Sequence, residues 1–299
     1  MVNREVYKSK AKINLFLHVL SVETNGFHNL QSITYFPNIF DELTFSVKDI
    51  FSENPIDNTI KATGEFASFL PRPKNNSIIK VIEFFQETFS INDNIHVNLK
   101  KNLPIGGGIG GGSSNTAITI MAMNDIFNLG LSFLELLDIA KKFGSDVPVC
   151  MYQNSATFEG KGEITNPINL PELPILLINP KEPLITSKVF KTFDDINKQQ
   201  SDSLNSNKID LKNLQLDNFQ DLINFLNTTK NNLTDASISL NGNILSILKS
   251  LKHTNPVLSR MSGSGSSCFA IYNKASELQM AKKTMKALYP KAWIALAKN

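Results

Sequence analysis

The sequence contains little cysteine and little tryptophan: Cys150, Cys268 and one tryptophan occur in 299 residues. Two cysteines are too few for a disulfide framework or a cysteine-based metal cluster, so we expect a reducing, cytoplasmic location. No apolar run approaches the roughly 20 residues of a membrane-spanning helix. The N-terminus also lacks the apolar core of a signal peptide. The composition therefore predicts a protein without a membrane segment.

An excess of one charge is also missing. The 30 basic and 27 acidic residues are spread along the chain and give a net charge of +3. Proteins that bind nucleic acid usually carry a clustered basic patch, so we expect no nucleic-acid partner. The chain is long enough for about two domains with a buried core.

Glycine, by contrast, is concentrated in one stretch. Residues 104–116 read PIGGGIGGGSSNT, and six of these thirteen residues are glycine. An alternating segment, 95–101, precedes the stretch and an apolar-periodic segment, 117–127, follows it, which predicts a strand, a loop and a helix. Ser113 or Ser114 is expected to cap this helix. Glycine lets the backbone approach a ligand, and the amide groups of a helix N-terminus favour a phosphate.

Other kinds of glycine loop fit the stretch less well. A dinucleotide-binding loop matches at Gly106, Gly108 and Gly111, but a run so rich in glycine matches this pattern in several registers. The acidic residue that such a loop requires further on falls in helical patterns, at Asp125 or Glu135. A Walker loop needs a lysine after the glycines, and none follows. A flexible linker seldom lies between a strand and a capped helix.

Four further residues near the N-terminus are candidates for a functional site. The segment 6–20 alternates and predicts one strand, on which Lys12 and Asn14 point to the same face. Phe27 and His28 follow an Asn-Gly turn, a position where a scaffold often presents recognition groups. Taken singly, a solvated lysine, a core phenylalanine and a structural histidine are the commoner interpretations.

Asp146 lies at a junction between two elements. A predicted helix over 133–143 begins at a capping box of Ser132 and Glu135 and ends at Gly144. Asp146 follows directly, in the segment GSDVPV. A capping aspartate is the simpler interpretation, and a carboxylate held in a site is the alternative.

The second half of the chain predicts a further α/β unit. A buried strand is expected at 173–179, and a Gly/Ser turn opens onto a strand at 268–272, followed by a helix and a closing strand at 292–297. This order of strands and helix is typical of a ferredoxin-like fold in the second half of the chain. Gly263 and Gly265 either make a plain turn or supply a second set of amides for phosphates.

Five motifs together resemble the GHMP small-molecule kinases: AKINLFL, NGFHNL, PIGGGIGGGSSN, GSDVPV and SGSGSSCF. They extend over residues 11–269, nearly the whole chain. AKINL, GFH and GSDVP together are similar to the members that phosphorylate a cytidine diphosphate methylerythritol in isoprenoid synthesis. The resemblance implies an α+β, two-domain GHMP kinase architecture. It implies a ribosomal protein S5 domain 2-like ATP domain over 1–157 and a ferredoxin-like domain over 158–299.

The resemblance also implies roles for individual residues. Asp146 matches the catalytic aspartate that takes the proton of the substrate hydroxyl, and Lys12 matches the lysine beside it. The ATP phosphate loop is expected to comprise Pro104, Ile105, Gly106, Gly107, Gly108, Ile109, Gly110, Gly111, Gly112, Ser113 and Ser114. The substrate site is expected to comprise Asn14, Phe27, His28, Phe190, Gly263 and Gly265. Phe27 and Phe190 would stack on the cytosine, and His28 would pair with its edge.

The implied co-substrate is ATP with Mg²⁺, and the implied partner is a small molecule bound by a monomer or weak homodimer. No glutamate is assigned to the metal, and Ser114 is the one candidate ligand. Phe27 stands where the family more often has tyrosine, which retains stacking without the hydroxyl. The GSG of the last motif replaces a more frequent GTG. Lys101 and Asn76 are expected neighbours of the adenine.

Two other functions fit the same sequence. One is a GHMP kinase for another small alcohol, such as mevalonate or homoserine. The paired aromatic residues Phe27 and Phe190, with His28, argue against it because a bare alcohol gives them no purpose. The other is a nucleotide-binding sensor without catalysis, against which the intact Lys12 and Asp146 argue.

Overall fold

The computed structural model describes residues 5–23, 26–48, 56–160, 163–197, 208–212 and 214–297. The chain divides into two compact units, and each is built from separate stretches of sequence. Unit 1 comprises Met1–Ala11, Phe40–Ile105 and Gly110–Gln153, and unit 2 comprises Lys12–Ile39, Gly106–Ile109 and Asn154–Asn299. The last change of unit falls between Gln153 and Asn154. The domain boundary expected near residue 157 stays a prediction.

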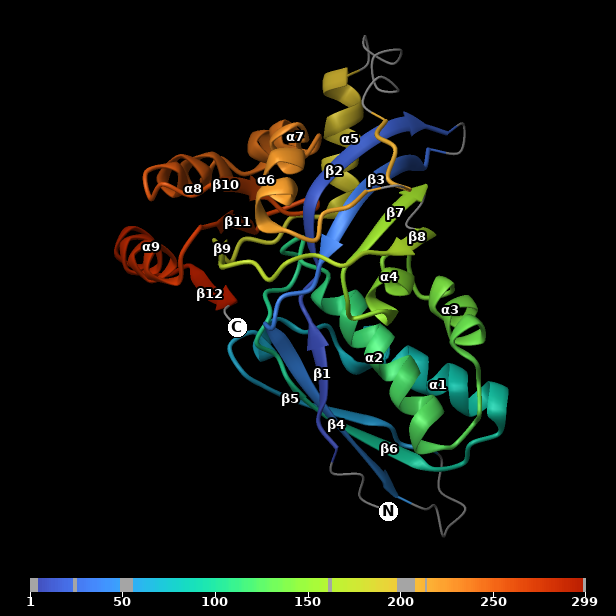
Figure 1. Cartoon of the computed structure of the whole chain (residues 1–299). Helices are drawn as coiled ribbons and strands as arrows, with labels where there is room; N and C mark the ends of the chain where they lie inside the picture. Colours follow the sequence, from blue (N-terminus) through green and yellow to red (C-terminus); the bar gives the residue numbers. More distant parts are fainter. Residues whose placement is uncertain are drawn as a thin grey trace. The chain divides into compact units, whose positions relative to one another are not determined.

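Unit 1 is a four-stranded sheet with helices along one face (Figure 1). The strand order is β1 (Tyr7–Lys10), β4 (Phe40–Lys48), β6 (Asn94–Lys100) and β5 (Thr59–Thr63), with β5 parallel to β6 and the other pairs antiparallel. The helices are α1 (Ser77–Phe89), α2 (Gly111–Ile126), α3 (Phe133–Lys141) and α4 (Val147–Met151), with short 3-10 turns at Ala67–Phe69 and Pro73–Asn75. Asn76 caps α1, because its Oδ1 accepts a hydrogen bond from the Ile78 amide at 3.0 Å.

Unit 2 contains two antiparallel four-stranded sheets. One has the order β2 (Ile13–Val22), β3 (His28–Tyr35), β7 (Ala156–Gly160) and β8 (Glu163–Pro167), and the other β10 (Leu258–Met261), β11 (Cys268–Ile271), β9 (Ile175–Asn179) and β12 (Trp293–Ala297). The helices are α5 (Thr186–Asn197), α6 (Phe219–Asn227), α7 (Thr234–Leu240), α8 (Asn243–Lys252) and α9 (Ala275–Leu288). Apolar side chains of β2, β9, β11 and four of these helices form one buried core. The strands and helices expected near the C-terminus are therefore confirmed.

The single strand expected over 6–20 is wrong. The segment forms β1 and β2, which pair with different strands and belong to different units. The alternation of apolar residues identifies a strand but carries no information about its partner, so the change of sheet at Ala11 and Lys12 leaves no mark in the pattern. Asn25, the first residue of the expected Asn-Gly turn, lies outside the described residues.

Both cysteines are buried, and neither forms a disulfide bond in the described structure. Burial raises the pKa of the Cys268 thiol above its usual value. Within the described ranges, no helix combines the length and the apolar character that crossing a membrane requires.

Candidate active site

The middle of the glycine loop belongs to unit 2, where each of its carbonyl groups accepts a hydrogen bond. Leu184 N donates to Gly106 O at 3.1 Å, Ser267 N to Gly107 O at 2.9 Å, Ser262 Oγ to Gly108 O at 2.9 Å, and Lys12 N to Ile109 O at 2.9 Å. Four consecutive carbonyl dipoles are thus neutralised by protein donors. Because a carbonyl oxygen repels an anion, this arrangement favours a phosphate on the opposite, amide side of the loop.

Two glycine motifs meet backbone to backbone in unit 2. Gly108 has φ +71°, and a Cβ added there would lie 2.4 Å from Ser262 O and 2.7 Å from Gly265 N. Gly263 has φ +55°, and a Cβ there would lie 2.8 Å from Gly108 O and 3.2 Å from Asn14 Oδ1. Only glycine permits both the positive φ and this close approach. The structure therefore brings Gly108, Gly263, Gly265 and Asn14 together.

Lys12 and Asn14 form a buried polar pair beside these glycines. Lys12 is 3% exposed, and its Nζ donates to Asn14 Oδ1 at 3.1 Å. Asn14 in turn donates from Nδ2 to Ser32 Oγ at 2.9 Å, and its backbone amide donates to Ser262 Oγ at 3.1 Å. The interpretation of Lys12 as a solvated edge charge is wrong, because the residue is buried within unit 2. The shared face predicted for Lys12 and Asn14 is confirmed.

The other end of the loop belongs to unit 1 and starts α2. The helix begins at Gly111, and Gly110, at φ 63°, takes the cap position. Ser113 and Ser114 lie inside the first turn, so the expected serine cap is wrong. A glycine has no side chain that accepts the first N–H groups, which have no partner within the helix. The N-terminus of α2 therefore keeps its first amide donors, the kind of group that can bind a phosphate.

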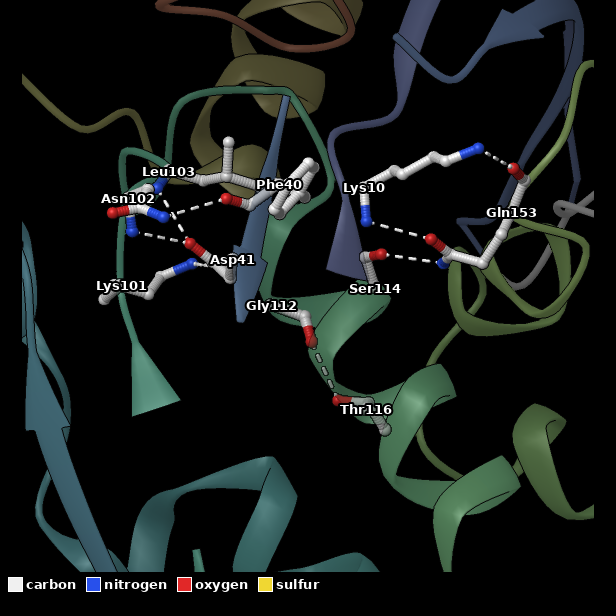
Figure 2. A network of polar contacts seen from close by, with 10 residues as sticks. All are labelled: Lys10, Phe40, Asp41, Lys101, Asn102, Leu103, Gly112, Ser114, Thr116 and Gln153. Atoms are coloured by element: carbon white, nitrogen blue, oxygen red, sulfur yellow. Dashed lines mark hydrogen bonds and ion pairs between the residues drawn. The ribbon is translucent and has the colours of Figure 1, made fainter. Parts of the chain in front are cut away.

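Ser114 is held by a different contact (Figure 2). Its Oγ accepts a hydrogen bond from Gln153 Nε2 at 2.9 Å, while Gln153 Oε1 accepts the Lys10 amide at 2.9 Å. Lys10 Nζ also donates to Gln153 O at 3.2 Å. Gln153 thereby ties β1 to the first turn of α2 in unit 1. Sequence reasoning missed it because the three residues are far apart in the chain.

A buried ion pair holds the chain where β6 runs into the glycine loop (Figure 2). Asp41 Oδ2 pairs with Lys101 Nζ, and Asp41 Oδ1 accepts the amides of Asn102 at 2.7 Å and Leu103 at 2.8 Å. Burial lowers the pKa of Lys101, and the Asp41 carboxylate opposes this shift. Lys101 Nζ lies 3.1 Å from the position of a Cβ on Gly111, so its charge is next to the start of α2. Sequence reasoning missed Asp41, although an acidic residue within an alternating strand can indicate a buried charge that needs a partner.

Asp146 occupies the position before α4 in unit 1. It is half-buried, and its side chain makes no capping hydrogen bond to the helix, so the interpretation as a capping aspartate is wrong. Val147 begins α4 although it precedes Pro148. A proline is tolerated in a first helical turn because its missing N–H has no acceptor there. The catalytic role of Asp146 remains a prediction, and Lys12 belongs to the other unit.

Two of the three residues expected at the cytosine contact each other in unit 2. The rings of His28 and Phe190 have centroids 4.5 Å apart, and His28 Nε2 lies 2.7 Å from Asp194 Oδ1. The His28 side chain is 8% exposed, whereas Phe27 is 58% exposed. Asp194 was missed by sequence reasoning. Its place on α5, four residues after Phe190, is the signal, because residues at this spacing share a helix face.

Within the described ranges, no three His, Cys, Asp or Glu side chains gather closely enough to hold a metal ion. Mg²⁺ in kinases usually has one or two carboxylate ligands and completes its shell with phosphate oxygens and water. A further polar group at α2 is Asn115, whose Oδ1 is buried and accepts no hydrogen bond from the described residues. Such an orphaned acceptor costs about 1–3 kcal/mol, which a ligand that donates to it relieves.

Known proteins resemble this chain over most of its length. Residues 76–154 match the GHMP kinases N terminal domain, and residues 209–291 match the GHMP kinases C terminal family. The 4-diphosphocytidyl-2-C-methyl-D-erythritol kinase of Chelativorans sp. (strain BNC1) is 31% identical over 94% of this chain and 91% of that protein. The enzyme of the same name from Francisella tularensis subsp. holarctica (strain OSU18) is 38% identical over 65% of this chain and 68% of that protein.

Solved structures agree on the fold. A crystal structure of 4-(cytidine 5'-diphospho)-2C-methyl-D-erythritol kinase aligns with a TM-score of 0.72 at 20% identity, covering 99% of this chain and 100% of that chain. L. major mevalonate kinase, in complex with R-mevalonate, aligns with a TM-score of 0.71 at 15% identity over 99% and 95% of the two chains. The chain therefore belongs to the GHMP kinases and, within them, to the family of 4-diphosphocytidyl-2-C-methyl-D-erythritol kinases. The α+β GHMP kinase architecture is confirmed.

Proposed function

We propose that this protein transfers the γ-phosphate of ATP to the 2-hydroxyl of 4-diphosphocytidyl-2-C-methyl-D-erythritol, giving the 2-phosphate and ADP in isoprenoid precursor synthesis. Relatives of this name match most of the chain. The observation that carries the proposal is the glycine loop that opens onto the uncapped N-terminus of α2, since phosphoryl transfer depends mainly on positioning and neutralising the phosphates.

The triphosphate is expected on the loop 104–114. The amides of Gly111, Gly112 and Ser113 donate to phosphate oxygens, and the neutralised carbonyls of the loop reduce the repulsion that an anion meets. Lys101, whose Nζ lies next to Gly111, is paired with Asp41, so this pair fixes the chain at the start of α2 and adds no net charge. Mg²⁺ bound with ATP supplies further charge neutralisation, and Ser114 stays its one candidate protein ligand. A cytoplasmic location and a monomeric or weakly dimeric state also stay predictions.

Asp146 and Lys12 are assigned to the transfer itself. Asp146 accepts the proton of the attacking hydroxyl, and Lys12 meets the transferring phosphoryl group with its ammonium. Asn14 supports the second role, because its Oδ1 accepts from Lys12 Nζ at 3.1 Å and holds the amine in one orientation. The assignment of Asp146 rests on its motif.

The cytosine is assigned to Phe27, His28 and Phe190. The 2.7 Å contact to Asp194 supports a role for His28 as an acceptor. A neutral imidazole that donates from Nε2 to a carboxylate keeps Nδ1 as an acceptor, and the exocyclic amino group of cytosine is a donor. Asp194 is thus a positioning residue, which sets the tautomer and angle of a ring that reads the base.

The test measures ADP release by the purified protein with Mg-ATP and one of three alcohols: 4-diphosphocytidyl-2-C-methyl-D-erythritol, mevalonate or homoserine. We expect turnover with the first alone. Asp146→Asn keeps the size of the side chain and is expected to lower kcat by about 100-fold or more, the scale of general-base catalysis. Asp138→Asn, on the exposed face of α3, is the matched control.

Each other outcome contradicts a separate part of the proposal. Equal turnover of mevalonate would refute the assignment of Phe27, His28 and Phe190 to cytosine, while the assignment as a kinase would stand. Unchanged turnover by Asp146→Asn would remove the proposed base. ATP binding without turnover of any alcohol would favour the alternative function, a nucleotide-binding sensor without catalysis.

A further inference from the structure

A recess of about 430 Å³ opens in unit 2, and no residue of the proposed active site lines it. Its walls come from α7, α8, β10 and the segment before α7. Sites for small molecules usually have volumes of about 300–1,000 Å³. The recess is therefore large enough for a metabolite-sized ligand.

One part of the wall is apolar. Ile238 of α7, Leu245 and Leu248 of α8, and Met261 at the end of β10 line it. Leu245 is 39% exposed, and Ile238 and Leu248 are half-buried. An apolar body placed here would remove these side chains from water.

The charged side chains that line the recess are mostly basic. They are Lys230, Lys249, Lys252 and Arg260, against the single acid Asp235. Lys249 and Lys252 occupy the last turn of α8, three residues apart and thus on the same side of the helix. In the part of the chain that the structure describes, no ion pair neutralises any of the three lysines. A ligand for this basic part of the recess carries negative charge.

Arg260 adds a fixed cation. Its guanidinium donates to the carbonyls of Leu15 at 2.9 Å, Leu226 at 2.7 Å and Thr229 at 2.7 Å, and to Thr229 Oγ1 at 3.0 Å. Carbonyl and hydroxyl oxygens satisfy the donors but carry no net charge, so the positive charge of Arg260 is not cancelled. Burial lowers the pKa of Arg260 to about 10, and the group stays charged at neutral pH.

We propose that this recess binds a small amphipathic anion, an organic phosphate or carboxylate with a hydrocarbon or ring body. The body packs on Ile238, Leu245, Leu248 and Met261, and the head group meets Lys249 and Lys252. A purely apolar molecule leaves the lysines unused, and a bare inorganic anion leaves the apolar wall in water. Both parts of the ligand are therefore needed for binding.

The recess also borders the second glycine motif. Asn231, which lines it, donates from Nδ2 to Met261 O at 2.9 Å and to Gly263 O at 2.8 Å. Ser262, between these two residues, donates to Gly108 O at 2.9 Å. A ligand that moves Asn231 or Met261 thus acts on the turn that supports the glycine loop. We expect occupancy to change the KM for ATP.

The binding test uses isothermal titration of the full chain with octyl phosphate, kept below its micelle concentration. Inorganic phosphate and 1-octanol are the two partial probes. We expect octyl phosphate to bind at least about tenfold more tightly than either, a difference of about 1.4 kcal/mol. Lys249→Gln with Lys252→Gln is expected to weaken octyl phosphate by at least the same factor. Leu245→Asn tests the apolar wall in the same way.

The matched control is Lys282→Gln with Lys283→Gln on α9, which removes the same charge from another exposed helix face. It should bind octyl phosphate as the parent does. No binding at millimolar octyl phosphate, or equal binding by both lysine double variants, would refute the proposed site. Kinase activity without the probe should be unchanged in both double variants, so failure of this proposal is separate from failure of the kinase assignment.

Discussion

Gly112→Ala separates the folding role of the glycine loop from its binding role. Gly112 is the second residue of α2, is exposed, and has open space within 4 Å of the position that a Cβ would take. Its φ lies outside the range that strains a side chain. The added methyl group therefore meets no protein atom. The only partner that it can obstruct is a ligand at the end of the helix.

The two expected effects have opposite signs. Alanine is favoured over glycine by about 1 kcal/mol in a helix interior, and less in a first turn, so the free energy of unfolding should stay equal or rise. A methyl group beside the amides holds a phosphate oxygen away from hydrogen-bond distance. Loss of one charge-assisted bond costs about 1.5–3 kcal/mol. This loss corresponds to an increase of about 10- to 150-fold in the Kd for ATP.

The assay combines urea unfolding with titration of ATP. Gly242→Ala is the matched control, because that position before α8 also has open space around a Cβ and a φ of −62°. We expect ATP binding to weaken in Gly112→Ala alone, with neither variant destabilised. An unchanged Kd for ATP in a folded Gly112→Ala protein would show that the phosphates do not lie at the end of α2.

Two further predictions concern unit 2. Asp194→Asn should raise the KM for the cytidylylated substrate about tenfold while kcat changes less than about twofold, because the carboxylate orients His28 and is assigned no part in the transfer. Steady-state kinetics check this, with the neighbouring Asp195→Asn as control, and a fall in kcat alone would contradict it. Arg260→Leu should lower the free energy of unfolding by about 3 kcal/mol, since the carbonyls of Leu15, Leu226 and Thr229 each lose a hydrogen bond from a charged donor. Urea denaturation measures the loss, and a change below about 1 kcal/mol would mean that water replaces the guanidinium.

Local features of the chain are readable from the sequence because they depend on neighbours within one or two turns. The capping box forms as predicted, with Ser132 N donating to Glu135 Oε2 at 2.8 Å and Glu135 N donating to Ser132 Oγ at 3.3 Å. The glycine loop lies between a strand and a helix as expected. These predictions need only short-range geometry and apolar periodicity.

Contacts between distant segments were not predictable in the same way. Asp194 lies 166 residues from His28, and Asp41 lies 60 residues from Lys101. Neither carboxylate lies in a sequence motif that would identify it as part of a site. Gly110, not a serine, precedes α2, because the loop enters the helix with a positive φ that a serine side chain disfavours.

By itself, the sequence determined the family, the glycine loop and the residue types that a phosphate and a base require. It did so because backbone freedom at glycine and the chemistry of Lys12, Asp146 and His28 belong to the residues themselves. The tertiary structure decided that Lys12 is buried against Asn14, that Asp194 contacts His28, and that lysines and leucines of α8 line one recess. The physical reason is that burial and charge pairing depend on which distant segments come into contact. The packing of the whole chain determines these contacts.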